Sequence, residues 1–168
     1  TAHASDRARG LPLLHSRHRP HENSSTRRVP TQVGCPLSCP CGATGAFGFL
    51  RNLSAAEIVD QVCRMRELLD AGRTITNVVF MGMGEPLLNL PAVSEAIRLF
   101  TDPKAFGLAP RRVTVSTAGV LPQIAPLLAV APLHLAVSLH ATTEEVRDVL
   151  VPPNHRSPID APLPTLRE

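Results

Sequence analysis

Three cysteines stand close together in the chain, with Cys35, Cys39 and Cys41 falling within seven residues. Thiolates at this density bind iron–sulfur clusters or zinc. A zinc site needs a fourth ligand, and no histidine lies close in the sequence. Three thiolates alone suit a cubane cluster that leaves one iron open to a substrate. The alternative interpretation is that these thiols bind no metal.

Glycines and polar residues follow three segments that have the pattern of buried strands. Gly82 and Gly84 let the backbone approach a ligand closely, and Glu85 would repel a phosphate but suit a ligand ammonium group. Hydroxyl and backbone groups at Ser116 and at the segment 138–140 could bind a carboxylate or a ribose. Taken singly, each is more often a helix cap or a satisfied polar group than a ligand contact. Together they indicate a shared pocket.

These residues need strands and helices to position them. A capping box at Ser54 and Glu57, followed by apolar residues at helical spacing, predicts a helix that stops near Gly72 and holds Cys63 as a core residue. Strands are predicted at residues 29–33, 76–81, 112–117 and 133–138, and further helices at 91–100, 121–130 and 142–150.

Alternating strands and helices imply a parallel sheet and an α/β fold. In such folds the carboxyl ends of the strands carry the functional site. About four strands are visible in 168 residues, so a closed eight-stranded barrel is excluded and a half barrel or open sheet is expected.

Composition restricts the function classes. With five Phe and no Trp or Tyr, the chain lacks the material for an aromatic platform that stacks single-stranded nucleic acid. No apolar run approaches a membrane span, and clustered cysteines without a disulfide framework indicate the reducing cytoplasm. Residues 1–30 hold six Arg and two acidic residues, which predicts a disordered basic tail over residues 1–28 that could contact RNA phosphates.

Six segments together resemble the RlmN/Cfr family of radical S-adenosylmethionine (SAM) enzymes, which methylate adenine in ribosomal RNA; the RlmN branch acts on C2 and also on certain tRNAs. The segments are Gln32–Cys35, Gly48–Leu53, Gly82–Asn89, Arg112–Thr117, Ser138–Ala141 and Arg147–Pro152. The resemblance implies a partial TIM-type barrel over residues 29–168, a [4Fe–4S] cluster and SAM as cofactors, and an electron donor such as flavodoxin or ferredoxin.

The resemblance also implies roles for individual residues. Cys35, Cys39 and Cys41 would hold the cluster. Gly84 and Glu85 would contact the amino group of SAM, and the rest of its pocket would be lined by Ser116, Ser138, Leu139 and His140.

This chain departs from the family pattern at the positions of three kinds of cysteine. The family spaces its cluster ligands Cys-x3-Cys-x2-Cys, whereas here the last gap holds one residue and Gly42 stands at the third ligand position. The position of the family's resolving cysteine is Arg28, and its methyl-carrying cysteine would lie beyond residue 168. Impaired or absent activity is therefore expected for this chain. The alternatives are a non-catalytic zinc-binding module and a radical SAM enzyme acting on another substrate.

Overall fold

A parallel sheet forms the centre of the computed structural model, which describes residues 25–40, 47–141 and 143–150. Its strands are β1 (Thr26–Arg28), β4 (Asn77–Phe80), β5 (Val113–Thr117) and β6 (His134–Val137), in the order β1-β4-β5-β6. Every neighbouring pair is parallel. The α/β class and the four-stranded parallel sheet expected from the sequence are confirmed.

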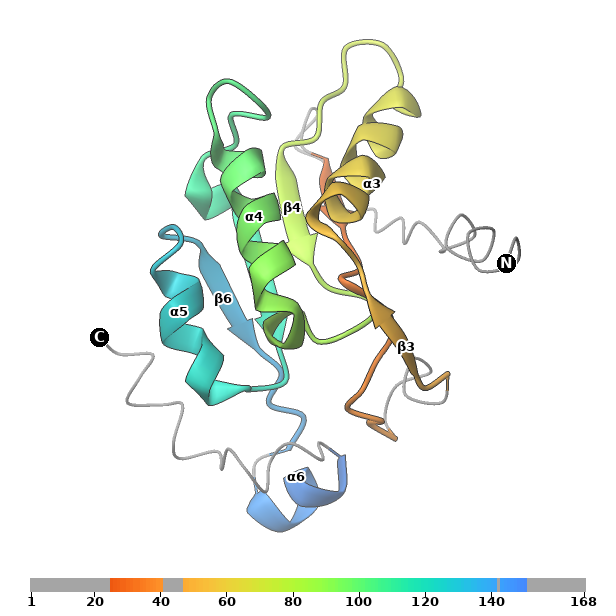
Figure 1. Ribbon diagram of the computed structural model, residues 1–168, viewed down its shortest axis with the longest axis vertical. Coiled ribbons are helices and arrows are strands. Elements are labelled where there is room, and N and C mark those ends of the chain that lie inside the picture. The colour runs from red at the N-terminus through yellow and green to blue at the C-terminus, as the bar shows by residue number, and fades with distance from the viewer. Residues whose placement is uncertain (1–24, 41–46, 142, 151–168) are drawn as a thin grey trace.

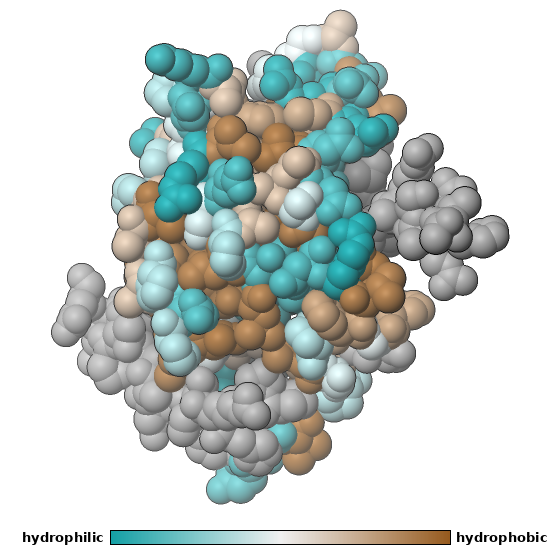
Figure 2. Space-filling view, in the orientation of Figure 1, coloured by the Kyte–Doolittle hydropathy of each residue, from teal (hydrophilic) through white to brown (hydrophobic). Residues whose placement is uncertain are grey.

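Helices cover one face of this sheet (Figure 1). They are α3 (Ala55–Glu67), α4 (Leu90–Thr101) and α5 (Ile124–Leu128). Alternate strand residues face them, so Val78 and Phe80 of β4 and Val113 and Val115 of β5 are fully buried in one apolar core. The intervening residues, such as Val79 and Ser116, are only half-buried, so the opposite face of the sheet is less covered than the helical face, and we call it the open face. Figure 2 shows hydrophobic residues among hydrophilic ones on the helical side.

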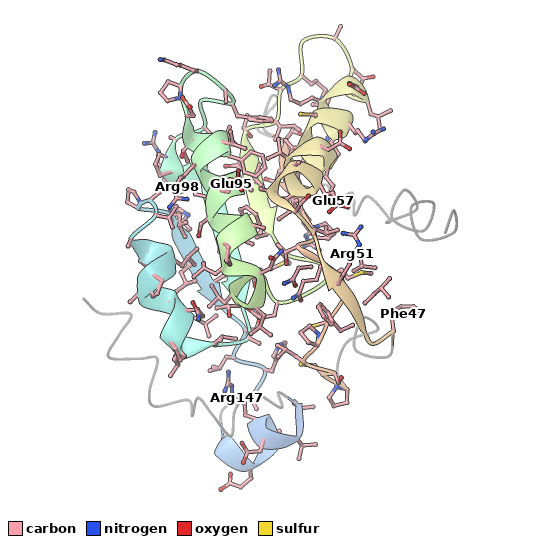
Figure 3. The ribbon with its side chains drawn as sticks, viewed as in Figure 1. Phe47, Arg51, Glu57, Glu95, Arg98 and Arg147 are labelled. Carbon is pink, nitrogen blue, oxygen red and sulfur yellow. The ribbon has the colours of Figure 1, made fainter. Side chains whose placement is uncertain are left out.

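The start of α3 follows the predicted capping box. Ser54 accepts a hydrogen bond from the backbone N–H of Glu57, and the Glu57 carboxylate accepts one from the N–H of Ser54. Arg51 pairs with Glu57 at 2.7 Å, and Figure 3 shows the two side chains meeting at this end of the helix. The predicted stop at Gly72 is wrong, because α3 ends at Glu67 and Gly72 lies in a following turn with a positive φ of 85°.

The remaining helices differ slightly from the predicted ranges. The helix predicted at 91–100 begins one residue earlier and is preceded by a 3₁₀ turn, η1 (Pro86–Asn89). The segment 121–130 splits into η3 (Leu121–Gln123) and α5, and Pro126 is accommodated in the first turn of α5. A further 3₁₀ turn, η2 (Pro110–Arg112), precedes β5, and α6 spans Glu144–Leu150.

The first strands correct two expectations about the N-terminal region. The strand predicted at 29–33 is replaced by β1 and by β2 (Gln32–Gly34), which forms an antiparallel hairpin with β3 (Phe49–Asn52). The boundary of the tail at residue 28 is also wrong, since β1 lies inside the range expected as disordered. Arg27 is only 5% exposed on the helix-covered face, and its charge concealed this strand in the sequence. The rest of the expected tail, residues 1–24, lies outside the described residues.

No helix in the described ranges is long and apolar enough to cross a membrane.

Candidate cofactor site

The carboxyl ends of the parallel strands meet at one edge of the sheet. There β4 leads into the turn Gly82–Glu85, β5 into the segment Thr117–Gly119, and β6 into the segment Ser138–His140. We call these three segments the strand-end loops. In Figure 1 the arrowheads of β4 and β6 point toward α6, which lies beside this edge. The topology therefore gathers the predicted SAM-binding residues in one region.

Glu85 joins two of the strand-end loops. Its side chain is 3% exposed; Oε1 accepts hydrogen bonds from the Leu87 N–H at 3.0 Å and the Thr117 hydroxyl at 2.7 Å, and Oε2 accepts one from the Ala118 N–H at 2.8 Å. Burial raises the pKa of Glu85, and these hydrogen bonds oppose the rise. A carboxylate has about four acceptor positions, and the three hydrogen bonds to Glu85 use one of the two at Oε2.

Strands β2 and β3 form a hairpin whose connecting loop contains the clustered cysteines, and we call it the cysteine hairpin. Gln32 connects this hairpin to the turn that holds Glu85. Its Oε1 accepts from the Glu85 N–H at 2.8 Å, and its Nε2 donates to Asn52 Oδ1 at 2.8 Å. Gly84 lies against it with a φ of 93°, and a Cβ at Gly84 would come within 2.5 Å of the Gln32 Cβ. Only glycine fits this close approach.

Asn89 makes the second connection between the hairpin and this turn. Its buried Nδ2 donates to the carbonyl oxygens of Thr31 and Leu53, each at 2.8 Å. The Thr31 N–H in turn donates to the Met83 carbonyl at 3.2 Å. These contacts, spanning 36 to 58 residues of sequence, fix the cysteine hairpin beside the Gly82–Glu85 turn.

Cys35 and Cys39 lie half-buried in the loop that follows β2. The Cys35 N–H donates to the Gly48 carbonyl at 2.9 Å, which ties the loop to the start of β3. Burial raises the pKa of the Cys35 thiol, the backbone at Leu37 lowers it, and the nearby charge of Glu85 raises it again. Metal binding would displace that thiol proton, since the thiolate is the ligand.

The described residues account for part of a cluster site. Two thiols in one loop fit part of an iron–sulfur cluster site, while the third predicted ligand, Cys41, lies outside the described residues. Within the described ranges no group of three metal-binding side chains is found. A complete trio of thiolates would therefore require Cys41.

The other predicted pocket residues lie on two neighbouring strands. Ser116 of β5 is half-buried on the open face, in register with Ala136 of β6. Ser138 lies two residues after Ala136, just past the end of β6. The Ser138 N–H donates to the Thr117 carbonyl at 2.8 Å. Leu139 and His140 are exposed, and His140 has a left-handed φ of 60°. Arg28, in register with Val79, lies on this open face too.

The sequence interpretation missed the residues that hold the site together. These are Gln32, Asn89, Thr117 and Arg147, all buried polar side chains. All four lie within the six segments that resemble the RlmN/Cfr family, and only Thr117 has a local signal, because it ends the strand that contains Ser116.

A family model for the radical SAM superfamily matches residues 29–161, which is most of the chain. The chain belongs to the radical SAM superfamily. Membership implies a [4Fe–4S] cluster and SAM as cofactors, as expected from the sequence. The described thiols and the strand-end loops are the parts of this radical SAM domain that fit those two groups.

Two relatives of similar sequence belong to one group of proteins within the radical SAM superfamily. The chain is 50% identical over 144 residues to the dual-specificity RNA methyltransferase RlmN of Syntrophobacter fumaroxidans, covering 86% of this chain and 42% of the relative. It is also 50% identical to RlmN of Halorhodospira halophila, over 86% of this chain and 40% of that protein. The resemblance to the RlmN/Cfr family is thereby confirmed.

A solved structure supports the radical SAM fold. A radical SAM methyltransferase from Sphaerobacter thermophilus superposes with a TM-score of 0.75 at 45% identity, covering 82% of this chain and 41% of that one. The chain thus spans about two fifths of the length of the relatives it matches.

Proposed function

We propose that this chain provides the cofactor-binding part of an RNA methyltransferase that modifies C2 of adenine in ribosomal RNA and in tRNA. The observation that carries the proposal is the attachment of the cysteine hairpin to the Gly82–Glu85 turn through Gln32 and Asn89. This attachment places two thiols next to a carboxylate at the carboxyl edge of a parallel sheet, in a chain about half identical to RlmN proteins.

In this proposal Cys35, Cys39 and Cys41 bind a [4Fe–4S] cluster. Glu85 uses the free acceptor position of Oε2 to bind the ammonium of SAM, and Gly84 leaves the backbone open to that group. Ser116, Ser138, Leu139 and His140 line the remainder of the SAM pocket. When bound, the cluster supplies the electron that cleaves the sulfonium of SAM reductively and generates a radical. A flavodoxin or ferredoxin would deliver that electron in the cytoplasm.

We further propose that the 168-residue chain does not methylate RNA by itself. Gly42 stands where the third cluster ligand is expected, and a one-residue shift moves a Cα by about 3.8 Å. Arg28 occupies the position expected for the resolving cysteine, and an arginine cannot attack a covalent RNA adduct as a thiolate would.

Anaerobic reconstitution with iron and sulfide tests the cofactor assignment. The chain is expected to take up both elements and to gain the broad visible absorbance of a cubane cluster, while Cys35→Ala and Cys39→Ala lose both. Cys63→Ala is the matched control, since that thiol lies within α3. Uptake of zinc with no visible absorbance would favour the metal-binding module and contradict the proposal.

Transfer of a labelled methyl group from SAM to ribosomal RNA and to tRNA tests the second part. No transfer is expected from the reconstituted chain with a reducing system present. Methylation by this chain would contradict the proposal that Arg28 and Gly42 prevent turnover.

A further inference from the structure

Arg147 is the largest fully buried side chain in the described part of the chain. It is 1% exposed and lies in the short helix α6, beside the carboxyl edge of the sheet (Figure 3). Burying a guanidinium is costly unless its N–H groups are matched by acceptors. Its placement therefore has to be explained by what it binds.

Arg147 donates to the backbones of two strand-end loops. Nη2 donates to the Ala118 carbonyl at 2.8 Å, and Nε donates to the Leu139 carbonyl at 3.1 Å. Ala118 follows β5 and Leu139 follows β6, so one side chain fixes the spacing between these two loops.

Ala118 extends this set of hydrogen bonds to the third strand-end loop, Gly82–Glu85. The Ala118 residue that accepts from Arg147 through its carbonyl donates through its N–H to Glu85 Oε2 at 2.8 Å. A chain of hydrogen bonds thus runs from Leu139 through Arg147 and Ala118 to Glu85. It connects the three strand-end loops, which contain or adjoin the residues to which the proposed function assigns SAM binding.

The surroundings leave the guanidinium little freedom. A Cβ at Gly119 would come within 3.3 Å of Nη2, and the φ of 105° at that glycine disfavours any side chain. Arginine presents donors in a rigid planar fork, whereas the ammonium of lysine is a single point on a flexible stem. A lysine at position 147 would lack the two donors, Nε and Nη2, that the fork holds at fixed positions for these carbonyls.

We infer that Arg147 is a positioning residue that holds the loops at Ala118 and Leu139 in the arrangement that binds SAM. This inference rests on the proposed function and deepens it, because it assigns the geometry of the cofactor pocket to a residue of α6. Arg147 lies outside the cysteine hairpin, so its removal should affect SAM binding and leave cluster uptake intact.

Equilibrium binding of SAM to the anaerobically reconstituted chain tests the inference, with iron and sulfide content measured on the same samples. For Arg147→Met and Arg147→Lys we expect the Kd for SAM to rise about tenfold to hundredfold, as for one to two lost charge-assisted hydrogen bonds. Iron and sulfide content should match the parent chain. Arg98→Met, which alters an exposed arginine of α4 labelled in Figure 3, is the matched control and should leave both quantities unchanged.

Amide hydrogen exchange supplies a readout independent of the cofactors. In the Arg147 variants the Ala118 and Gly119 amides should exchange faster, while the amides of β4 keep the parent rate. If the circular dichroism spectrum shows that Arg147→Met does not fold, the SAM affinity of Arg147→Lys is the measurement that tests the inference. A folded Arg147→Lys chain with weakened SAM binding supports the inference, and one with the Kd of the parent overturns it.

The outcomes separate the two proposals. A parent chain that holds the cluster and SAM, with variants that bind SAM equally well, overturns the inference about Arg147 alone. A parent chain that binds no SAM overturns the proposed function and this inference with it.

Discussion

The Thr117 hydroxyl donates to Glu85 Oε1 at 2.7 Å, joining the last residue of β5 to the turn that follows β4. The same hydroxyl accepts from the Gly119 N–H at 3.0 Å, so one buried side chain satisfies groups on two loops. Glu85 is a buried carboxylate whose pKa is raised mainly by burial, and Thr117 is one of the donors that lower it. Loss of this contact would therefore raise the pKa of Glu85 further.

Thr117→Val should lower the free energy of unfolding by about 1–3 kcal/mol, because an isosteric methyl leaves the Gly119 N–H and the Glu85 carboxylate without their partner. Thr117→Ser retains the hydroxyl and should lose less. Chemical denaturation of the two variants and the parent provides the comparison. A Thr117→Val chain as stable as the parent would show that the hydroxyl contributes nothing here.

The stability of Thr117→Val should depend on pH in a direction that the pKa of Glu85 determines. Because the pKa of Glu85 is raised in the folded state, that state holds the proton more tightly than the unfolded chain. The contribution of Glu85 to stability therefore decreases as pH rises from the ordinary carboxyl range through the raised value. Removal of the Thr117 hydroxyl should extend this decrease to higher pH, which denaturation midpoints measured across pH can detect.

Asn89→Asp should detach the cysteine hairpin from the 82–85 turn. The substitution keeps the shape of the side chain and replaces its two donated hydrogen bonds with an acceptor facing the Thr31 and Leu53 carbonyls. We expect a loss of about 2–5 kcal/mol, since two buried carbonyls lose their donor and a charge is buried. Glu95→Gln, an exposed position on α4, the helix that Asn89 precedes, is the control. Stability equal to the parent would show that the hairpin is held by other contacts.

The ion pair of Glu57 at the start of α3 should contribute to the stability of the fold in a way that is lost in acid. Hydrogen bonding to Arg51 lowers the pKa of Glu57 to about 2 from an ordinary value of 4.5. A depressed carboxyl pKa stabilises the fold above the unfolded value, and the effect is lost as pH falls from about 4.5 toward about 2. Glu57→Gln should lower stability by about 1 kcal/mol at neutral pH, because the cap weakens and the ion pair is partly exposed.

The difference between Glu57→Gln and the parent should shrink as the solution is acidified through that window. Asp60→Asn removes an exposed ion pair one turn further along α3 and should change stability less than Glu57→Gln does at neutral pH. A difference that stays constant with pH would exclude the ion pair as its origin.

Gly42→Cys restores the ligand spacing of the family and should raise iron and sulfide uptake above that of the parent chain. Combining it with Cys41→Ser should preserve the gain if the restored cysteine is the third ligand. Iron and sulfide analysis after reconstitution measures both variants. Loss of uptake in the double variant would identify Cys41 as the ligand that the chain uses.

Sequence patterns among neighbouring residues predicted the helices and strands whose apolar residues recur at regular spacing. The capping box at Ser54 and Glu57 and the apolar strand around Val78 were found where predicted, because both depend on neighbouring residues. Strand β1 was missed, since Thr26–Arg28 carries two arginines and owes its conformation to pairing with β4, about fifty residues away.

The connections within the site could not be read from the sequence for the same reason. Gln32 meets Glu85 across 53 residues, and Arg147 meets Ala118 across 29. Polar side chains in such contacts have no periodicity, and only the folded arrangement shows which of them are buried. The sequence predicted the strand ends at which ligand groups gather but not the side chains that hold those ends together.

The sheet has helices on one face and none of the described strands beside the outer edge of β6. Within the described ranges no strand pairs with that edge, and the hairpin exposes Phe47 and Leu50 by 78% and 67%. A sheet edge of this kind can accept a strand from a second copy, and exposed apolar side chains favour the same association. Sedimentation should therefore reveal self-association that grows with concentration.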